Sequence, residues 1–292
     1  MATVCLVYRA IVVNNSLGRC GSLLRNFQRT TLRTLSSDVS QHYQEVNGVN
    51  IHYEKTGQGN HTLLLLPGAL GSSQTDFSPQ LSGLNRDKFT LIAWDPRGYG
   101  KSRPPDRDFP KKFFDRDAED AAQLMKTLGY SKYSLLGWSD GGITALLIAA
   151  RHSSALRKMV LWGGNSFVAE EDIKLYEATR DINDWSERMR TPMINMYGEE
   201  YFRKTWEAWV DGISRYWTEF EGDICKAELK NIKCPTLIVH GQKDPLVPQY
   251  HPDHLVANIK GSKLINWPDA KHNLHLRYAD EFNKLVEDFL SQ

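Results

Sequence analysis

The chain has 292 residues, of which 41% are hydrophobic, enough to form the core of one large domain with or without an insertion. Its four cysteines lie far apart and lack the spacing of metal ligands, which argues against a disulfide scaffold and a zinc site. Five of the 36 Lys and Arg residues fall within the first 35 positions, which leaves 31 against 35 acidic residues; this balance excludes a basic surface for nucleic acid.

The first 36 residues differ from the rest of the chain. They contain five arginines, several serines and threonines, and no Asp, Glu or Lys. This composition is typical of a mitochondrial transit peptide, although a disordered tail or a weak secretory signal is an alternative. We therefore expect a mitochondrial protein that loses residues 1–36, which a fluorescent fusion of this segment would test. No apolar run reaches the roughly 18 residues of a membrane span, so we expect no membrane partner.

Beyond residue 36, the hydrophobic pattern predicts strands that alternate with helices. The first two strands meet at Asn47-Gly48, the strongest short signal for a hairpin. Strands are predicted at 43–46, 50–53, 62–66, 89–94, up to Gly137, 158–162, 235–240 and 263–267, and helices at 76–84, 115–128, 143–150, 252–259 and 274–290. The alternation predicts an α/β domain at 37–292 with a mostly parallel sheet and right-handed crossovers.

Residues 167–232 interrupt this alternation. They carry many charges and have aromatic side chains at helical intervals, among them Trp206 and Trp209. An insertion directly after a strand lies near the strand ends, so we predict a mainly helical lid over a cleft. Most of its rings are expected to serve packing. The pattern does not indicate which of them face the cleft.

A sequence Gly137-Trp138-Ser139-Asp140-Gly141 follows one predicted strand and precedes a helix. In that context Gly-x-Ser-x-Gly predicts a nucleophile elbow, a sharp turn that presents the serine hydroxyl at the edge of the sheet. The alternative is an ordinary turn between a strand and a helix. Ser139 is therefore our candidate nucleophile.

A serine nucleophile needs a base and a group that orients the base. Asp244 follows the predicted strand 235–240, and His272 follows the last strand, so both lie where ligands bind in a parallel sheet. The order Ser, Asp, His is the one that this arrangement of strands requires. We predict a triad of Ser139, Asp244 and His272, with His275 as the fallback base.

An oxyanion hole needs two N–H donors close to the nucleophile. The amide of Asp140, at the start of the helix after Ser139, supplies the first. The loop Pro67-Gly68-Ala69 after the strand 62–66 supplies the second through the amide of Ala69, with Leu70 as the alternative.

Together these motifs resemble the α/β-hydrolase superfamily, over a stretch from about Val46 to the C-terminus. The resemblance rests on the elbow, on Asp95-Pro96-Arg97-Gly98-Tyr99-Gly100 with Ser102, on Gly241 with Asp244-Pro245, and on His272-Asn273-Leu274-His275. It implies an α/β-hydrolase fold with a helical cap. It further implies a cofactor-independent serine esterase for α-amino acid esters, including esters of the aminoacyl nucleoside type. The chain departs from many members at Pro67, where they have His, and at Lys271, where they often have Gly.

The resemblance also implies a role for the side chain of Asp140. A carboxylate beside the nucleophile would attract the α-ammonium group of a substrate and repel an acid. The alternative is that Asp140 only favours the positive end of the helix that follows it. Asp95 and Arg97 are expected to brace a turn at a strand end.

His251 and His254 lack a third clustered ligand, so no metal is predicted, and no cofactor is expected. The expected partner is a small ester substrate, and the protein is expected to be a monomer. Two alternative functions remain open. One is hydrolysis of a carbon–carbon bond by the same triad, and the other is a non-catalytic binding protein of the same fold.

Overall fold

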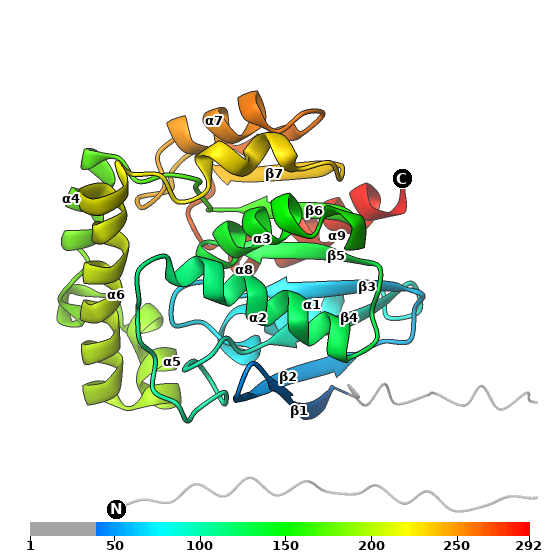
Figure 1. Ribbon diagram of the computed structural model, residues 1–292, viewed down its shortest axis with the longest axis horizontal. Coiled ribbons are helices and arrows are strands. Elements are labelled where there is room, and N and C mark those ends of the chain that lie inside the picture. The colour runs from blue at the N-terminus through cyan, green and yellow to red at the C-terminus, as the bar shows by residue number, and fades with distance from the viewer. Residues whose placement is uncertain (1–38) are drawn as a thin grey trace, which may run out of the picture. The chain divides into compact units, whose positions relative to one another are not determined.

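The computed structural model describes residues 39–292, and the predicted transit peptide lies outside this range. Within the described residues, eight strands form one sheet in the order β1-β2-β4-β3-β5-β6-β7-β8 (Figure 1). The strands are β1 (Ser40–Val46), β2 (Val49–Thr56), β3 (His61–Leu66), β4 (Phe89–Trp94), β5 (Tyr133–Trp138), β6 (Leu156–Trp162), β7 (Thr236–Gly241) and β8 (Lys263–Trp267). Strand β2 runs antiparallel to β1 and β4, whereas β3 to β8 are parallel. This is the predicted α/β-hydrolase fold.

Helices cover both faces of the sheet, as Figure 1 shows. Helices α2, α3 and α7 pack on one face, and α1, α8 and α9 pack on the other. The helices of the two faces are α1 (Ser73–Gly83), α2 (Phe113–Thr127), α3 (Asp140–Arg151), α7 (Tyr250–Asn258), α8 (Leu274–Arg277) and α9 (Ala279–Ser291), with a short 3₁₀ helix η1 (Ser153–Ala155). The central strands β3, β4, β5, β6 and β7 are therefore buried on both sides.

Strand β3 illustrates why these strands are apolar throughout. Its side chains alternate between the two faces, so Leu64 and Leu66 enter one hydrophobic cluster while Leu63 and Leu65 enter the other. All four leucines are completely buried. A strand between two helical layers needs hydrophobic residues at every position, which is the pattern that the sequence displays.

The segment between β6 and β7 contains α4 (Glu170–Glu177), α5 (Glu187–Tyr197) and α6 (Glu199–Phe220), with 3₁₀ helices η2 (Ile182–Asp184) and η3 (Lys226–Asn231). We call residues 167–232 the cap. Helices α4, α5 and α6 stack beyond one end of the sheet, on the left of Figure 1. Two cap tyrosines reach loops that follow core strands: the hydroxyl of Tyr197 donates to the carbonyl of Leu70, and that of Tyr201 donates to Gly98.

The predicted final helix, 274–290, is wrong in one respect. The chain leaves helical geometry at Tyr278 (φ −124°, ψ 51°), which separates α8 from α9. The Tyr278 ring packs edge-on against Trp267, and His275 is held by hydrogen bonds in α8, so the two short helices have separate anchors. Apolar residues keep helical spacing across the break, and the sequence pattern therefore conceals it.

In residues 39–292, no helix has both the length and the apolar composition needed to cross a membrane.

Candidate active site

The candidate nucleophile lies on strained backbone between β5 and α3. Ser139 has φ 54° and ψ −121°, a conformation that costs free energy and that functional sites often contain. A side chain at Gly141 would place its Cβ 1.9 Å from the carbonyl oxygen of Leu66, so only glycine permits this close approach. Ser139 is partly exposed. Its geometry is that of the predicted elbow.

Asp244 and His272 lie in the loops after two adjacent strands, β7 and β8. Oδ2 of Asp244 accepts a hydrogen bond from Nδ1 of His272 at 2.8 Å. Oδ1 of the same carboxylate accepts the amides of Leu246 and Val247 at 2.9 and 3.1 Å. The Asp244 side chain is 1% exposed and the His272 side chain 14% exposed. The carboxylate is thus buried behind the imidazole, and Nε2 of the ring is left to act as a base.

The pKa values of this pair shift in opposite directions. Burial opposes the charged form of His272, but Asp244 outweighs it, with help from Asp140 and Asp76, and raises the pKa of the imidazole. Burial also opposes ionisation of Asp244, yet His272 and the two amide donors lower the pKa of the carboxyl. Asp244 therefore stabilises the imidazolium that forms when His272 takes a proton.

The residues around the elbow hold His272 close to Ser139. The indole Nε1 of Trp138, the residue before Ser139, donates to the carbonyl of His272 at 3.0 Å. A Cβ at Gly163 would lie 2.9 Å from Cε1 of His272, and one at Gly164 would lie 3.3 Å from the carbonyl oxygen of Ser139. The turn after β6 therefore touches both residues, and the structure brings the three predicted groups to one edge of the sheet.

The fallback base, His275, has a different environment. It is completely buried, its Nδ1 accepts the indole N–H of Trp162 at 2.9 Å, and its Nε2 donates to the carbonyl of Asp76 at 3.0 Å. Burial lowers its pKa to about 3. With both ring nitrogens occupied, His275 is a neutral structural residue and has no free nitrogen for a substrate.

Both predicted oxyanion donors are free. The amides of Ala69 and Asp140 donate to no acceptor within residues 39–292. Ala69 is partly exposed, as are Ser139 and His272. The neighbouring Leu70 adopts φ 54°, and its carbonyl accepts the hydroxyl of Tyr197 at 2.6 Å. Ser139, His272 and the Ala69 amide donor are thus on partly exposed residues, whereas Asp140 is buried.

Asp76 supports the oxyanion loop, and the sequence analysis did not identify it. Its Oδ2 accepts the amide of Gly68 at 2.9 Å, and its Oδ1 accepts the hydroxyl of Thr75 at 2.7 Å. Burial raises the pKa of Asp76 to about 7. The sequence placed Asp76 only at a helix start. Its role depends on a loop that folds back eight residues earlier, and no local pattern reports such a contact.

Asp140 is bound by the cap. Its Oδ2 accepts the indole Nε1 of Trp209, on α6, at 2.7 Å. Burial is the main cause that raises the pKa of Asp140 to about 7. The nearby Arg107 forms a bidentate pair with Asp117 at 2.7 and 2.6 Å. Within the described residues, Asp140 is therefore a buried carboxylate without an ion-pair partner of its own.

The two polar residues that were expected to brace a turn do so. Asp95 accepts hydrogen bonds from His52 and from the amides of Ser73 and Lys101, all at 2.7 to 2.8 Å. Arg97 pairs with Asp120 through Nε and Nη2. Of the histidines considered as metal ligands, His251 bonds to Asp172, and residues 39–292 hold no group of three or more candidate ligands.

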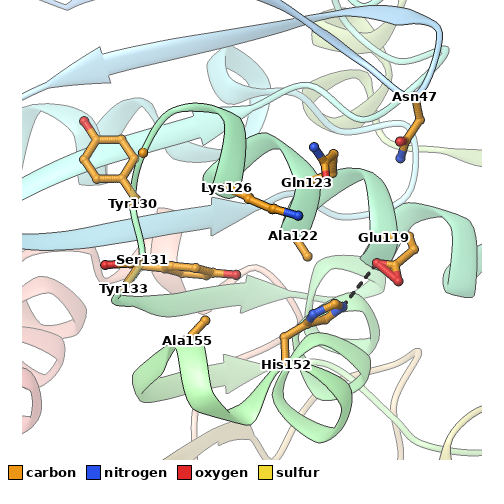
Figure 2. Close-up of a pocket in the computed structure, with 11 residues that line it drawn as sticks. Asn47, Glu119, Ala122, Gln123, Lys126, Tyr130, Ser131, Tyr133, His152 and Ala155 are labelled. Carbon is orange, nitrogen blue, oxygen red and sulfur yellow. Dashed lines mark ion pairs between the residues drawn. The ribbon is translucent and has the colours of Figure 1, made fainter.

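One pocket lies away from the triad. It has a volume of about 560 Å³ and sits at the start of β5, where Tyr133 lines it, whereas Ser139 follows the end of that strand. Figure 2 shows Glu119 of α2 paired with His152, at 3.2 Å, on one side of this pocket. No triad residue lines it. This pocket therefore does not mark the candidate active site, which is identified by its chemical groups.

Comparisons with known proteins agree with the fold and the motifs. Residues 63–285 match the alpha/beta hydrolase family. The chain is 57% identical over 263 residues to serine hydrolase BPHL of Mus musculus, covering 90% of each chain, and 59% identical over 245 residues to that of Homo sapiens, covering 84% of each. Serine hydrolase BPHL is also called biphenyl hydrolase-like protein or valacyclovir hydrolase.

Solved structures with lower identity share the fold. A meta-cleavage product hydrolase from Pseudomonas fluorescens IP01 superposes with a TM-score of 0.73 at 20% identity, covering 87% of this chain and 98% of that one. The enol-lactonase from Burkholderia xenovorans LB400 superposes with a TM-score of 0.69 at 24% identity, covering 86% of this chain and 100% of that one.

Proposed function

The chain belongs to the alpha/beta hydrolase family and is a serine hydrolase; from that premise we propose that it is a carboxylesterase that cleaves α-amino acid esters. The observation that carries the proposal is the Asp140 carboxylate, which is buried beside the nucleophile and has no ion-pair partner within residues 39–292. A substrate ammonium would supply the missing cation.

In the proposed reaction, Oγ of Ser139 attacks the ester carbonyl carbon while Nε2 of His272 takes the hydroxyl proton. The oxyanion that forms accepts the amides of Ala69 and Asp140. Collapse of this intermediate breaks the bond to the alcohol oxygen, which leaves with the proton from His272, and the acyl group remains on Ser139. Water, deprotonated by His272, then releases the amino acid and restores Ser139.

The neighbours of Asp140 support recognition of an amine. The Asp140 carboxylate helps to raise the pKa of His272, so it lies near the candidate base. The α-amino group of an amino acid ester is one carbon away from the carbonyl that Ser139 attacks. A carboxylate beside the oxyanion hole therefore suits an α-ammonium group on the acyl side of the ester.

The same carboxylate argues against hydrolysis of a carbon–carbon bond in an acidic dienoate. A relative from Burkholderia vietnamiensis that is 29% identical over 271 residues is named a 2-hydroxy-6-oxononadienedioate hydrolase. An anionic substrate of that kind would lie close to Asp140 and be repelled by its ionised form. A non-catalytic binding role is the remaining alternative, and it requires a serine that does not react.

The test uses the Asp140→Asn variant with two matched esters, one with a free α-amino group and one with hydrogen in its place. Removing one charge of a desolvated pair costs about 2–5 kcal/mol, or roughly 30- to several thousand-fold. We expect that loss in kcat/KM for the amino ester and little change for the other ester. Equal losses for the two esters would contradict amine recognition.

A fluorophosphonate probe separates an enzyme from a binding protein. We expect it to label Ser139 in the wild type and in Asp140→Asn, because the variant keeps the serine, the base and the backbone amides. An unlabelled wild type would favour the non-catalytic alternative. Cleavage of an acidic dienoate in preference to either ester would favour the carbon–carbon alternative.

A further inference from the structure

Two tryptophans on cap helix α6 stack on each other, are equally buried and have different hydrogen-bond partners. Trp206 and Trp209 stack with ring centroids 4.6 Å apart and planes 20° apart, and each is 6% exposed. Nε1 of Trp206 donates to the carbonyl of Thr179 within the cap, at 2.8 Å. Nε1 of Trp209 leaves the cap and donates to Oδ2 of Asp140. The two tryptophans therefore differ in the acceptor of their indole N–H.

The contact uses only one of the two carboxylate oxygens. Asp140 is 8% exposed, and its Oδ1 accepts no hydrogen bond from residues 39–292. The indole is itself immobilised, because Trp206 stacks on one side and the ring of Tyr176 meets it edge-on at 5.4 Å. A rigid donor on one oxygen restricts rotation of the carboxylate and leaves the second oxygen for a ligand.

We propose that Trp209 is a specificity-determining positioning residue, whose indole N–H orients the Asp140 carboxylate so that Oδ1 receives the α-ammonium group of the substrate. This inference rests on the proposed function, since it presumes that Asp140 reads the amine. It assigns part of that selectivity to the cap, which supplies none of the groups that react with the ester carbonyl. Trp209 acts through Asp140 and is not itself a catalytic residue.

The hydrogen bond also affects ionisation of Asp140. An N–H that donates to a carboxylate favours its charged form, so the bond lowers a pKa that burial raises. The charged and titratable groups around Asp140 are Arg107, Asp117, His272, Tyr99 and Tyr176. Loss of the indole would leave these groups in place and move the titration of Asp140 to higher pH.

The experiment compares the ratio of kcat/KM for the amino ester to kcat/KM for its des-amino match. Taking the ratio cancels the titration of His272, which both esters require. In the wild type we expect the ratio to rise with pH through about 7, as Asp140 ionises, and to fall again when the substrate amine loses its proton. In Trp209→Phe we expect a ratio lower by roughly tenfold at neutral pH and a rising limb at higher pH.

The matched control is Trp206→Phe. Phenylalanine keeps an aromatic ring to stack on Trp209. The variant removes an equally buried indole N–H, but one that donates to the Thr179 carbonyl, which also accepts the indole of Trp185. We expect its ratio to equal that of the wild type, even if its melting temperature falls. An equal drop of the ratio in both variants, or no drop in Trp209→Phe, would overturn the inference.

A double-mutant cycle tests whether Trp209 acts through Asp140. In an Asp140→Asn background, we expect Trp209→Phe to leave the ratio unchanged; a tenfold loss there would overturn the inference. If Trp209→Phe does not fold, NMR on the wild type replaces it. One indole N–H resonance should follow pH with a midpoint near that of Asp140 and lose this dependence in Asp140→Asn. An absence of such a resonance would overturn the inference.

The outcomes also separate this inference from the function it rests on. A wild type that does not distinguish the two esters contradicts the proposed function. A wild type that distinguishes them, with a Trp209→Phe variant that does so equally well, contradicts only the role of Trp209.

Discussion

The strand ends and the cap contribute to the same site in different ways. In the proposed reaction, the strand ends supply the reactive groups through backbone geometry: a positive φ at Ser139, free amides at Ala69 and Asp140, and loops that place Asp244 behind His272. The cap supplies single polar atoms on helical side chains, such as the indole N–H of Trp209 and the hydroxyl of Tyr197. In the proposed mechanism, one region carries the chemistry and the other adjusts it.

This difference predicts a gradient of mutational effects. A group that forms or breaks bonds cannot be replaced by its neighbours, so its loss affects the rate by many orders of magnitude. A group that holds another group in position shares that task with the surrounding packing, so its loss costs less. Variants in the strand ends and in the cap therefore test whether the two regions play these different roles.

Ser139→Ala should have the largest effect. We expect kcat to fall by about 10⁶, as when the nucleophile of such a unit is removed, while the melting temperature stays close to that of the wild type. The measurement is ester hydrolysis by pure variant, with circular dichroism as the control for folding. Turnover within tenfold of the wild type would show that the strand ends do not carry the chemistry in this way.

The two histidines of the C-terminal region sharpen the comparison within the core. His272→Ala should reduce kcat about as much as Ser139→Ala, because residues that act as a unit are not additive. His275→Ala should instead keep most of its activity per folded molecule. It leaves the buried N–H of Trp162 unpaired, which costs about 1–3 kcal/mol of stability.

Thermal unfolding and hydrolysis rates of the two variants provide the check. At about 2–4 °C per kcal/mol for a domain of this size, the change in His275→Ala should be visible as a lower melting temperature. A variant at His275 that stays stable and loses all activity would reverse the two assignments.

The sequence predicted the strand-end half of the site far better than the cap half. Ser139, Asp244 and His272 each follow a recognisable strand, and in a parallel sheet the ends of neighbouring strands converge, so local patterns suffice to bring these residues together. The elbow also has a local signature, because glycine must stand where Gly141 approaches Leu66.

The remaining contacts depend on packing between distant segments. Trp206 and Trp209 have the same residue type, helix and exposure, and only the crossing of α6 over the core decides which indole meets Asp140. The sequence similarly indicates only that Asp76 lies at a helix start. In the structure, it accepts the amide of Gly68 from the loop before that helix. Helical periodicity indicates a buried face but does not identify its partner, so the sequence could not predict these contacts.

Tyr197→Phe should have the smallest effect, and it tests whether the cap also tunes the oxyanion hole. The Tyr197 hydroxyl donates to the carbonyl of Leu70 and accepts the amide of Gly100 at 2.8 Å. Leu70 adjoins Ala69, whose amide is the predicted donor, so loss of the hydroxyl frees the loop on which that donor lies. We expect a stability loss of about 1 kcal/mol and a decrease in kcat of up to about tenfold.

Tyr201→Phe is the matched control for this variant. Its ring stacks on that of Tyr197 at 5.7 Å, and its hydroxyl bridges Gly98 and the amide of Arg107, neither of which adjoins the oxyanion loop. It should therefore lose a similar amount of stability and keep the wild-type kcat. Equal decreases in kcat would mean that the two tyrosines only attach the cap to the core. A decrease confined to Tyr197→Phe would mean that the cap reaches the oxyanion hole through the backbone of Leu70, in addition to reaching Asp140 through Trp209.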